Sequence, residues 1–190
     1  VPQDPPLQDD LIRTLVHGYY ASLSYMDAQV GRVLDEVDRL GFKENTIIVL
    51  WGDHGYHLGD HGMWTKHTNY EQANRIPIVI CAPGMVGGGS TPALVESVDI
   101  YPTLCDLAGL PAPTEPQPID GRSLVPVLRD TTQSVRDHVY HCYPRGGRLE
   151  AARGDGPLPL GPRALLLAWD PESLAGLRDL YAGFYLGEDD

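Results

Sequence analysis

The residues most able to do chemistry lie together in the stretch TIIVLWGDHGYHLGDHGMWTKHTN, residues 46–69. An apolar run ends there in Asp53 and His54, and four of the seven histidines of the chain fall between His54 and His67. A carboxylate beside an imidazole offers one oxygen and one nitrogen donor to a metal ion, and nearby glycines let the backbone fold tightly around it. The pair predicts half of a coordination sphere at the end of a buried strand, where α/β proteins place ligands.

Two other interpretations of this loop are open from the residues alone. Asp53 could cap a following turn while the histidines face water. Alternatively, His57 and His61 could bind zinc if they lay four residues apart on a helix. The glycines at positions 55, 59 and 62 disfavour such a helix, so the zinc site ranks below a site built on Asp53 and His54.

The flanking sequence predicts the elements that must position the loop. Apolar residues three or four apart predict one amphipathic helix over residues 9–40, with Asp9 or Asp10 as its N-cap and Gly41 as its stop. The apolar stripe comprises Leu11, Leu15, Tyr19, Leu23, Met26, Val30, Val33, Leu34 and Val37. The continuous apolar run at 46–51 predicts a strand buried on both faces, as in a parallel sheet covered by helices.

The rest of the chain predicts further helices and strands. Residues 76–84 indicate a second buried strand with Pro77 near its start. A strand end is expected to turn into a short helix that is capped by Asp99 and stops at Gly109. Further elements are expected as a helix over 123–130, a strand over 138–143 and a weakly indicated helix over 171–184. Helices interleaved with buried strands predict an α/β sandwich.

Composition and charge narrow the class of protein. With 190 residues and 42% hydrophobic content, the chain can bury one ordinary core. The formal charge of -12 disfavours nucleic acid as a partner, because binding to phosphates needs a basic face. The sequence contains no apolar run of about 18 residues, the length that spanning a membrane requires. The start VPQDPPLQDD does not have the pattern of a signal peptide. Three cysteines without a CxxC pair argue against a disulfide scaffold.

A long segment of the chain resembles the sulfatases of the alkaline phosphatase superfamily. The loop GDHGYHLGDHGMWTK is its most specific part, and the similarity continues through VDIYPTLCDLAGLPAP and IDGRSLVPVLRD. It covers residues 14–145 and is closest to the iduronate-2-sulfatases. The resemblance implies an alkaline-phosphatase-like mixed sheet sandwiched by helices, incomplete in this chain. Residues 1–145 would be the C-terminal portion of a sulfatase catalytic domain, and residues 146–190 an atypical tail rich in Gly, Pro and Leu.

The resemblance also implies roles for single residues. Asp53 and His54 match two calcium ligands of the family, with Mg²⁺ or Mn²⁺ as alternative ions. Lys66 matches the lysine that binds the sulfate group, and a lysine is a compact charge suited to neutralising a sulfate oxygen. The implied substrate-binding residues are Lys66, His61, His67 and Tyr56. Tyr56 stands where the iduronate-2-sulfatases have a tryptophan.

The nucleophile of the family is a cysteine converted to formylglycine inside C-x-P-S-R or a close variant, and these 190 residues do not encode it. Cys81 lies in CAPGM and Cys142 in CYPRG, neither of which fits the motif, so both are expected to be structural. The chain by itself is expected to bind calcium weakly, because that ion prefers six to eight oxygen ligands. It is also expected not to hydrolyse sulfate esters.

The function implied by the resemblance is hydrolysis of a sulfate ester on a sulfated uronic acid or related sugar. A phosphodiester or phosphonate monoester hydrolase of the same superfamily is the alternative enzyme, since it shares the Asp-His pair and a lysine at similar spacing. A non-catalytic relic or interaction fragment is the alternative outside the enzymes. The expected partners are a sulfated sugar or another small sulfate ester, a separate N-terminal half, and further copies of the chain through exposed apolar faces. The family implies a location outside the cytoplasm.

Overall fold

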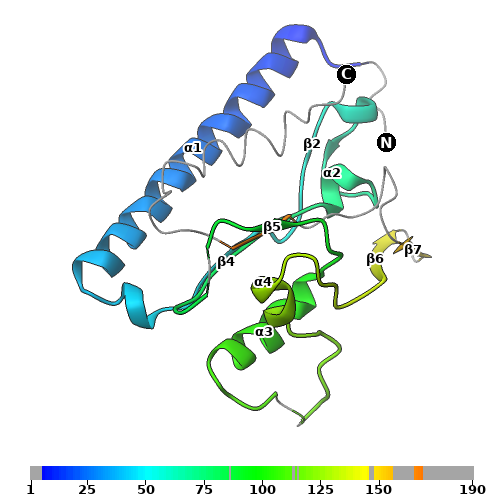
Figure 1. Ribbon diagram of the computed structural model, residues 1–190. Helices are drawn as coiled ribbons and strands as arrows, with labels where there is room; N and C mark the ends of the chain where they lie inside the picture. The colour runs from blue at the N-terminus through cyan, green and yellow to red at the C-terminus, as the bar shows by residue number, and fades with distance from the viewer. Residues whose placement is uncertain are drawn as a thin grey trace.

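The computed structural model describes residues 6–85, 87–112, 114, 116–145, 148–155 and 165–168. The described elements form three layers. Helix α1 (Asp9–Arg39) lies on one side of a central sheet, and helices α3 (Ile100–Leu107) and α4 (Val125–Arg129) lie on the other (Figure 1). The expected sheet between helices is therefore confirmed, and the helices expected around 100–109 and 123–130 are present. The helix expected over 171–184 lies outside the described residues.

The central sheet has the strand order β1-β4-β8-β5. Strand β4 (Pro77–Cys81) pairs antiparallel with β1 (Ile48–Trp51) and parallel with β8 (Leu165–Ala168), and β5 (Ser90–Thr91) pairs antiparallel with β8. The sheet is thus mixed, as expected, but the parallel arrangement expected for the first strand is wrong. That strand lies at one edge of the described sheet and is only half buried, with Trp51 exposed.

The remaining elements are short. Strands β2 (His57–Leu58) and β3 (Trp64–Thr65) form one antiparallel pair, and β6 (His138–Arg145) and β7 (Arg148–Asp155) form another. The strand expected at 138–143 is therefore present, although it pairs with β7 and not with the central sheet. Short helices lie at Lys43–Asn45 (η1), Asp60–Gly62 (η2), Glu71–Asn74 (α2) and Ser97–Asp99 (η3). Residues 97–99 are helical, whereas a strand end was expected before α3.

Helix α1 ends as its sequence predicts but begins differently. Gln8 is the N-cap residue, so the expectation that Asp9 or Asp10 caps the helix is wrong. Both aspartates lie in the first turn, where their charge is favourable at the positive end of the helix dipole. Gly41 ends the helix with a φ of 72°, and its N–H donates to the carbonyl oxygen of Asp38 at 2.9 Å.

Helix α1 is described throughout its length and buries none of its residues. Its half-buried apolar face comprises Ile12, Val16, Tyr19, Leu23, Met26, Val30, Leu34 and Val37. Leu11, Leu15 and Val33 belong to the expected stripe, yet they are 46%, 41% and 63% exposed. The expected stripe combined residues from neighbouring faces of the helix, and only one of these faces can point toward the sheet. A cavity of about 250 Å³, lined by apolar side chains of α1, β1 and β4, separates helix and sheet.

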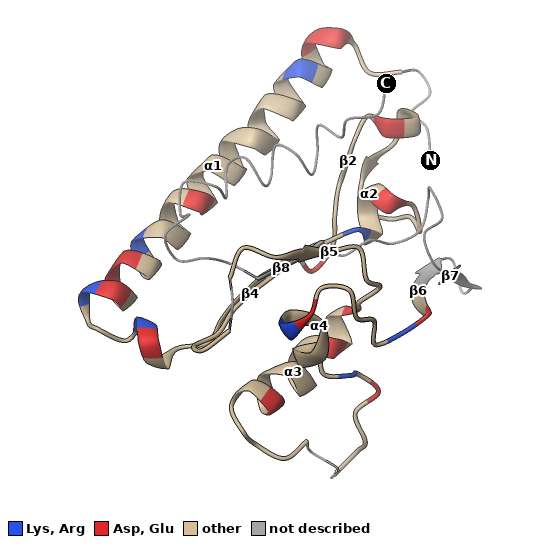
Figure 2. Ribbon diagram, in the orientation of Figure 1, with Lys and Arg blue, Asp and Glu red and all other residues tan. Residues whose placement is uncertain are grey.

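The main core lies on the opposite face of the sheet, between β4 and the helices α3 and α4. Ile78 and Ile80 of β4 are almost completely buried there against Ile100, Leu124 and Val127. Figure 2 shows acidic residues on α1, α2, α3 and the connecting loops, with basic residues at scattered positions between them. None of the described helices has the length and apolar character that crossing a membrane requires.

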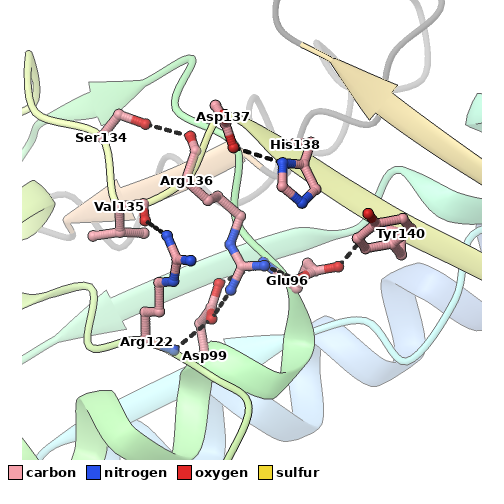
Figure 3. A network of polar contacts seen from close by, with 9 residues as sticks. All are labelled: Glu96, Asp99, Arg122, Ser134, Val135, Arg136, Asp137, His138 and Tyr140. Atoms are coloured by element: carbon pink, nitrogen blue, oxygen red, sulfur yellow. Dashed lines mark hydrogen bonds and ion pairs between the residues drawn. The ribbon is translucent and has the colours of Figure 1, made fainter.

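A buried ion network ties this core to β6 (Figure 3). Asp99 is the N-cap residue of α3, as expected. Its fully buried carboxylate accepts hydrogen bonds from the N–H groups of Glu96 and Arg122 and makes none to the first turn of α3. Arg136 forms ion pairs with both Asp99 and Glu96, and Glu96 accepts the N–H of Tyr140. Burial raises the pKa of Asp99 to about 6, against the opposing effect of the Arg122 N–H.

Candidate functional site

Asp53 and His54 lie in the turn that follows the carboxyl end of β1. The turn is anchored to α2, because the N–H of Gly55 donates to the carbonyl oxygen of Ala73 at 2.7 Å. A Cβ atom at Gly55 would lie 2.1 Å from the carbonyl oxygen of Gln72, so only glycine fits this close approach. The glycine after the Asp-His pair thus fixes where the pair sits.

The imidazole of His54 is held so that Nε2 keeps its lone pair. A carbonyl oxygen can only accept, so His54 Nδ1 donates to the carbonyl oxygen of Gly55 at 2.8 Å. Nε2 is then the acceptor, and Lys66 Nζ donates to it at 2.5 Å. Metal-binding histidines commonly donate their other ring N–H to a carbonyl oxygen, so this tautomer also suits coordination through Nε2.

Asp53 completes a cluster with His54 and Lys66, here called the Asp-His-Lys cluster. Asp53 Oδ1 accepts the N–H of His54 at 3.0 Å, and Asp53 Oδ2 lies 3.5 Å from His54 Nε2. The Asp53 side chain is 84% exposed. One carboxylate, one imidazole nitrogen and one ammonium therefore converge at the surface of the loop.

Lys66 reaches His54, twelve residues earlier in the chain, through the pair of strands β2 and β3. It follows Thr65, whose φ of 75° lies in the left-handed region that β-branched residues rarely adopt. The loop between the strands passes through η2, with Gly59 at a φ of 110°. The backbone thus folds back on itself and returns Lys66 to the end of β1.

The other expected substrate-binding residues lie elsewhere on the loop. The ring of His61 lies 5.3 Å from that of Tyr70, and His67 is exposed. The ring of Tyr56 lies 5.3 Å from that of Tyr19 on α1. Tyr56 lines a pocket of about 330 Å³ between α1 and the loop, and no member of the Asp-His-Lys cluster lines that pocket.

His57 was considered only as a zinc ligand from the sequence, and the structure buries it completely. Its Nε2 lies 2.7 Å from Thr68 Oγ1, and burial lowers the pKa of His57. His61 has a φ of 54° and lies outside regular helical geometry, so the two rings do not align on a helix. The spacing of the histidines gave no signal that His57 alone would be buried, because glycines interrupt the pattern around all of them.

The donor set fits a divalent cation in part. Asp53 and His54 offer one carboxylate and one imidazole nitrogen, with the tautomer of His54 already set for coordination. Over the described ranges of the chain, no three His, Cys, Asp or Glu side chains come together to hold a metal ion. Calcium prefers six to eight oxygen ligands, whereas Asp53 offers at most two oxygens and His54 a nitrogen, so these residues would supply only a minor part of a calcium coordination sphere.

Comparison with known proteins places the chain in a family. The family model described as Sulfatase matches residues 3–110, which is more than half of the chain. Iduronate 2-sulfatase of Mus musculus is 38% identical over 133 residues, which cover 57% of this chain and 24% of that protein. A sulfatase of Formosa agariphila is 42% identical over 100 residues, which cover 53% of this chain and 20% of that protein. The chain spans about a quarter or less of the length of these relatives.

Two solved structures share the fold. The structure of BT4656 in complex with its substrate D-glucosamine-2-N,6-O-disulfate matches with a TM-score of 0.61 and 34% identity, over 68% of this chain and 26% of that one. Phosphonate monoester hydrolase SpPMH from Silicibacter pomeroyi matches with a TM-score of 0.67 and 27% identity, over 95% of this chain and 42% of that one. With a family match over more than half of its length, this chain belongs to the sulfatase family.

Proposed function

We propose that the Asp-His-Lys cluster is the half of a sulfatase active site that holds the sulfate group of a sulfate ester together with a divalent cation. The observation that carries the proposal is the convergence of Lys66 and Asp53 on the Nε2 atom of His54, at 2.5 and 3.5 Å. Membership of the sulfatase family supports it. The proposed activity is that of a sulfuric ester hydrolase.

Each residue of the cluster has a distinct task in this proposal. The ammonium of Lys66 neutralises a sulfate oxygen and stabilises the charge that grows on it during ester cleavage. Asp53 and His54 would hold the cation, with Ca²⁺ as first choice and Mg²⁺ or Mn²⁺ as alternatives, and a bound cation supplies Lewis-acid polarisation of the sulfate group. These 190 residues encode no formylglycine motif, so the nucleophile of the proposed reaction would have to be supplied by other residues.

The proposed substrate is a sulfated uronic acid or a related sulfated sugar. Similarity to iduronate 2-sulfatases, at 38% identity in Mus musculus and 35% in Homo sapiens, supports the uronic acid. An N-acetylglucosamine-6-O-sulfatase of Bacteroides thetaiotaomicron, at 36%, supports the broader class of sulfated sugars. His61, His67 and Tyr56 are proposed to contact the sugar. A location outside the cytoplasm is supported by the 39% identity to a Drosophila melanogaster protein named extracellular sulfatase SULF-1 homolog.

Titration of the 190-residue chain with inorganic sulfate, followed by NMR at constant ionic strength, tests the proposal. Sulfate is expected to shift the backbone amide signals of Asp53, His54 and Lys66. Lys66→Met should weaken binding about tenfold or more, because a charge-assisted hydrogen bond is lost. Lys43→Met is the matched control, since Lys43 in η1 is the other lysine of the chain. Equal binding by both variants, or no effect of sulfate on the cluster, would favour a non-catalytic fragment.

A phosphonate monoester hydrolase is the second candidate, because SpPMH matches 95% of this chain with a TM-score of 0.67. The same NMR titration with phenyl sulfate and with a phenyl phosphonate monoester separates the two functions. Both compounds carry one negative charge, so the comparison reports recognition of the central group rather than net charge. The sulfatase proposal predicts tighter binding of the sulfate ester, and the reverse order supports the second candidate.

A further inference from the structure

His57 lies on the site loop, outside the Asp-His-Lys cluster. We propose that His57 is a positioning residue for Lys66. His57 holds the chain on both sides of Lys66: it pairs with Thr65 through the backbone and with Thr68 through its ring. The inference rests on the proposed role of Lys66 at a sulfate group. In addition, contacts of the buried His57 set the direction of the Lys66 side chain.

The chain before Lys66 is held by the pairing of β2 with β3. His57 stands opposite Thr65 in this ladder, and Leu58 stands opposite Trp64. The φ of 75° at Thr65 is rare for a β-branched residue, and such a backbone persists only where its surroundings fix it. Because Lys66 comes next, the conformation of Thr65 sets the direction in which Lys66 leaves β3.

The chain after Lys66 is held by the ring of His57. His57 Nε2 and Thr68 Oγ1 share a hydrogen bond of 2.7 Å, and the N–H of Thr68 donates to the carbonyl oxygen of Lys66 at 2.9 Å. Thr68 therefore links the buried ring to the backbone of Lys66. The N–H of Tyr70 donates to the same hydroxyl at 3.3 Å, and its ring meets that of His57 edge to face at 6.2 Å.

Burial defines what His57 can do. The residue is 0% exposed, whereas Lys66 is exposed. His57 Nδ1 is buried and has no hydrogen-bond partner among the residues that the structure describes. Protonation would place an N–H on both ring nitrogens, and the one at Nδ1 would be buried without an acceptor. The neutral ring therefore fits this environment. A completely buried neutral ring with a single side-chain hydrogen bond suits holding a turn in place rather than contact with an ion or a substrate.

Removing the hydroxyl of Thr68 tests the hydrogen bond between His57 and Thr68 with little change in side-chain volume. In the full 190-residue chain, the nuclear Overhauser effect between the Lys66 side-chain methylene next to Nζ and the His54 ring protons reports their contact. Thr68→Val is expected to reduce this signal at least twofold and to weaken sulfate binding about tenfold. Thr68→Ser keeps the hydroxyl and should retain both properties. His57→Gln, which keeps a polar group near the position of Nε2, should lie between these two variants.

Contacts between Ile78 and Leu124 in the core report whether each variant is folded. A folded Thr68→Val protein with an unchanged Lys66–His54 contact overturns the proposal, even if His57→Gln fails to fold. The proposed function fails separately, if the wild-type chain does not bind sulfate. In that case a lost Lys66–His54 contact in Thr68→Val still supports the positioning role.

Discussion

At the scale of single residues, the Asp-His-Lys cluster gathers one oxygen donor, one nitrogen donor and one cation around His54 Nε2. Lys66 Nζ donates to the same His54 nitrogen that would bind the cation in the proposed site. A cation and the ammonium would therefore compete for one lone pair. On cation binding, Lys66 would turn away from His54 and find new acceptors on the sulfate group.

The first prediction concerns calcium. Two ligands with one carboxylate give a weak site, so calorimetric titration of the 190-residue chain is expected to show a Kd of about 1 mM or weaker. Asp53→Ala removes the only carboxylate of the cluster and should abolish this weak binding, whereas Asp35→Ala on the exposed face of α1 should not change it. Tight calcium binding that survives Asp53→Ala would show that the ion is held elsewhere.

The second prediction concerns the pH dependence of stability. Burial lowers the pKa of His57 in the folded state below the ordinary value of 6.5. Below about pH 6.5, His57 is protonated in the unfolded state but remains neutral in the folded state. Protonation therefore favours unfolding, and the contribution of His57 to the free energy of unfolding is highest above this pH and declines as the pH falls.

His57→Gln cannot titrate, and comparison with it isolates this contribution. The difference in unfolding free energy between wild type and His57→Gln should shrink from pH 7 to pH 5, measured by urea denaturation. A difference that stays constant over this range would contradict the buried neutral ring. His141, whose pKa burial also lowers, is present in both proteins and cancels.

At the scale of elements, the ion network holds η3, the segment before α4 and β6 together (Figure 3). Arg136 is 9% exposed and Asp99 is fully buried, so removal of the arginine leaves a buried carboxylate without its ion partner. Arg136→Met is expected to lower the free energy of unfolding by about 3 kcal/mol or more.

The matched control for the ion network is Arg39→Met. Arg39 pairs with Glu36 at the end of α1, where both side chains are more than half exposed. Solvent screens this pair, so its loss should leave the stability nearly unchanged. Denaturant unfolding at pH 7 compares the two variants, and similar losses of stability in both would rule out a special role for the buried network.

At the scale of the whole molecule, the two faces of the sheet differ. The face toward α3 and α4 carries the packed core, while a cavity of about 250 Å³ lies beneath α1. Backbone amides of α1 are therefore expected to open with a lower free energy than those of β4 in native-state hydrogen exchange. Equal protection of the two elements would mean that α1 is packed as firmly as the core.

Sequence reasoning succeeded where the determinants are local. Gly41 and Gly109 stop helices because both adopt positive φ, and Asp53 and His54 follow an apolar run directly. Lys66 was assigned from family resemblance, since nothing in its own surroundings predicts that the backbone at Thr65 turns it toward His54.

Sequence reasoning failed where distant partners decide. Asp99 is the N-cap residue of α3, as expected, but its carboxylate makes no capping hydrogen bond, because donors 23 and 37 residues away, at Arg122 and Arg136, occupy it. Strand β8 is four residues long and becomes a strand through pairing with β4 and β5. The face of α1 that points toward the sheet could not be predicted, because apolar residues occupy adjacent positions such as Leu15 and Val16 and so lie on more than one face of the helix.

The most direct measurement of the central claim is the activity of a chimera. Residues 42–84, from the residue after Gly41 to the turn after β4, replace the corresponding segment of the Formosa agariphila sulfatase. Hydrolysis of an aryl sulfate is then measured against the parent enzyme. The chimera is expected to be active, and Lys66→Met should lower kcat about 100-fold or more, while Lys43→Met leaves it unchanged. A folded chimera without activity, or one in which Lys66→Met has no more effect than Lys43→Met, would contradict the assignment of this loop to a sulfatase active site.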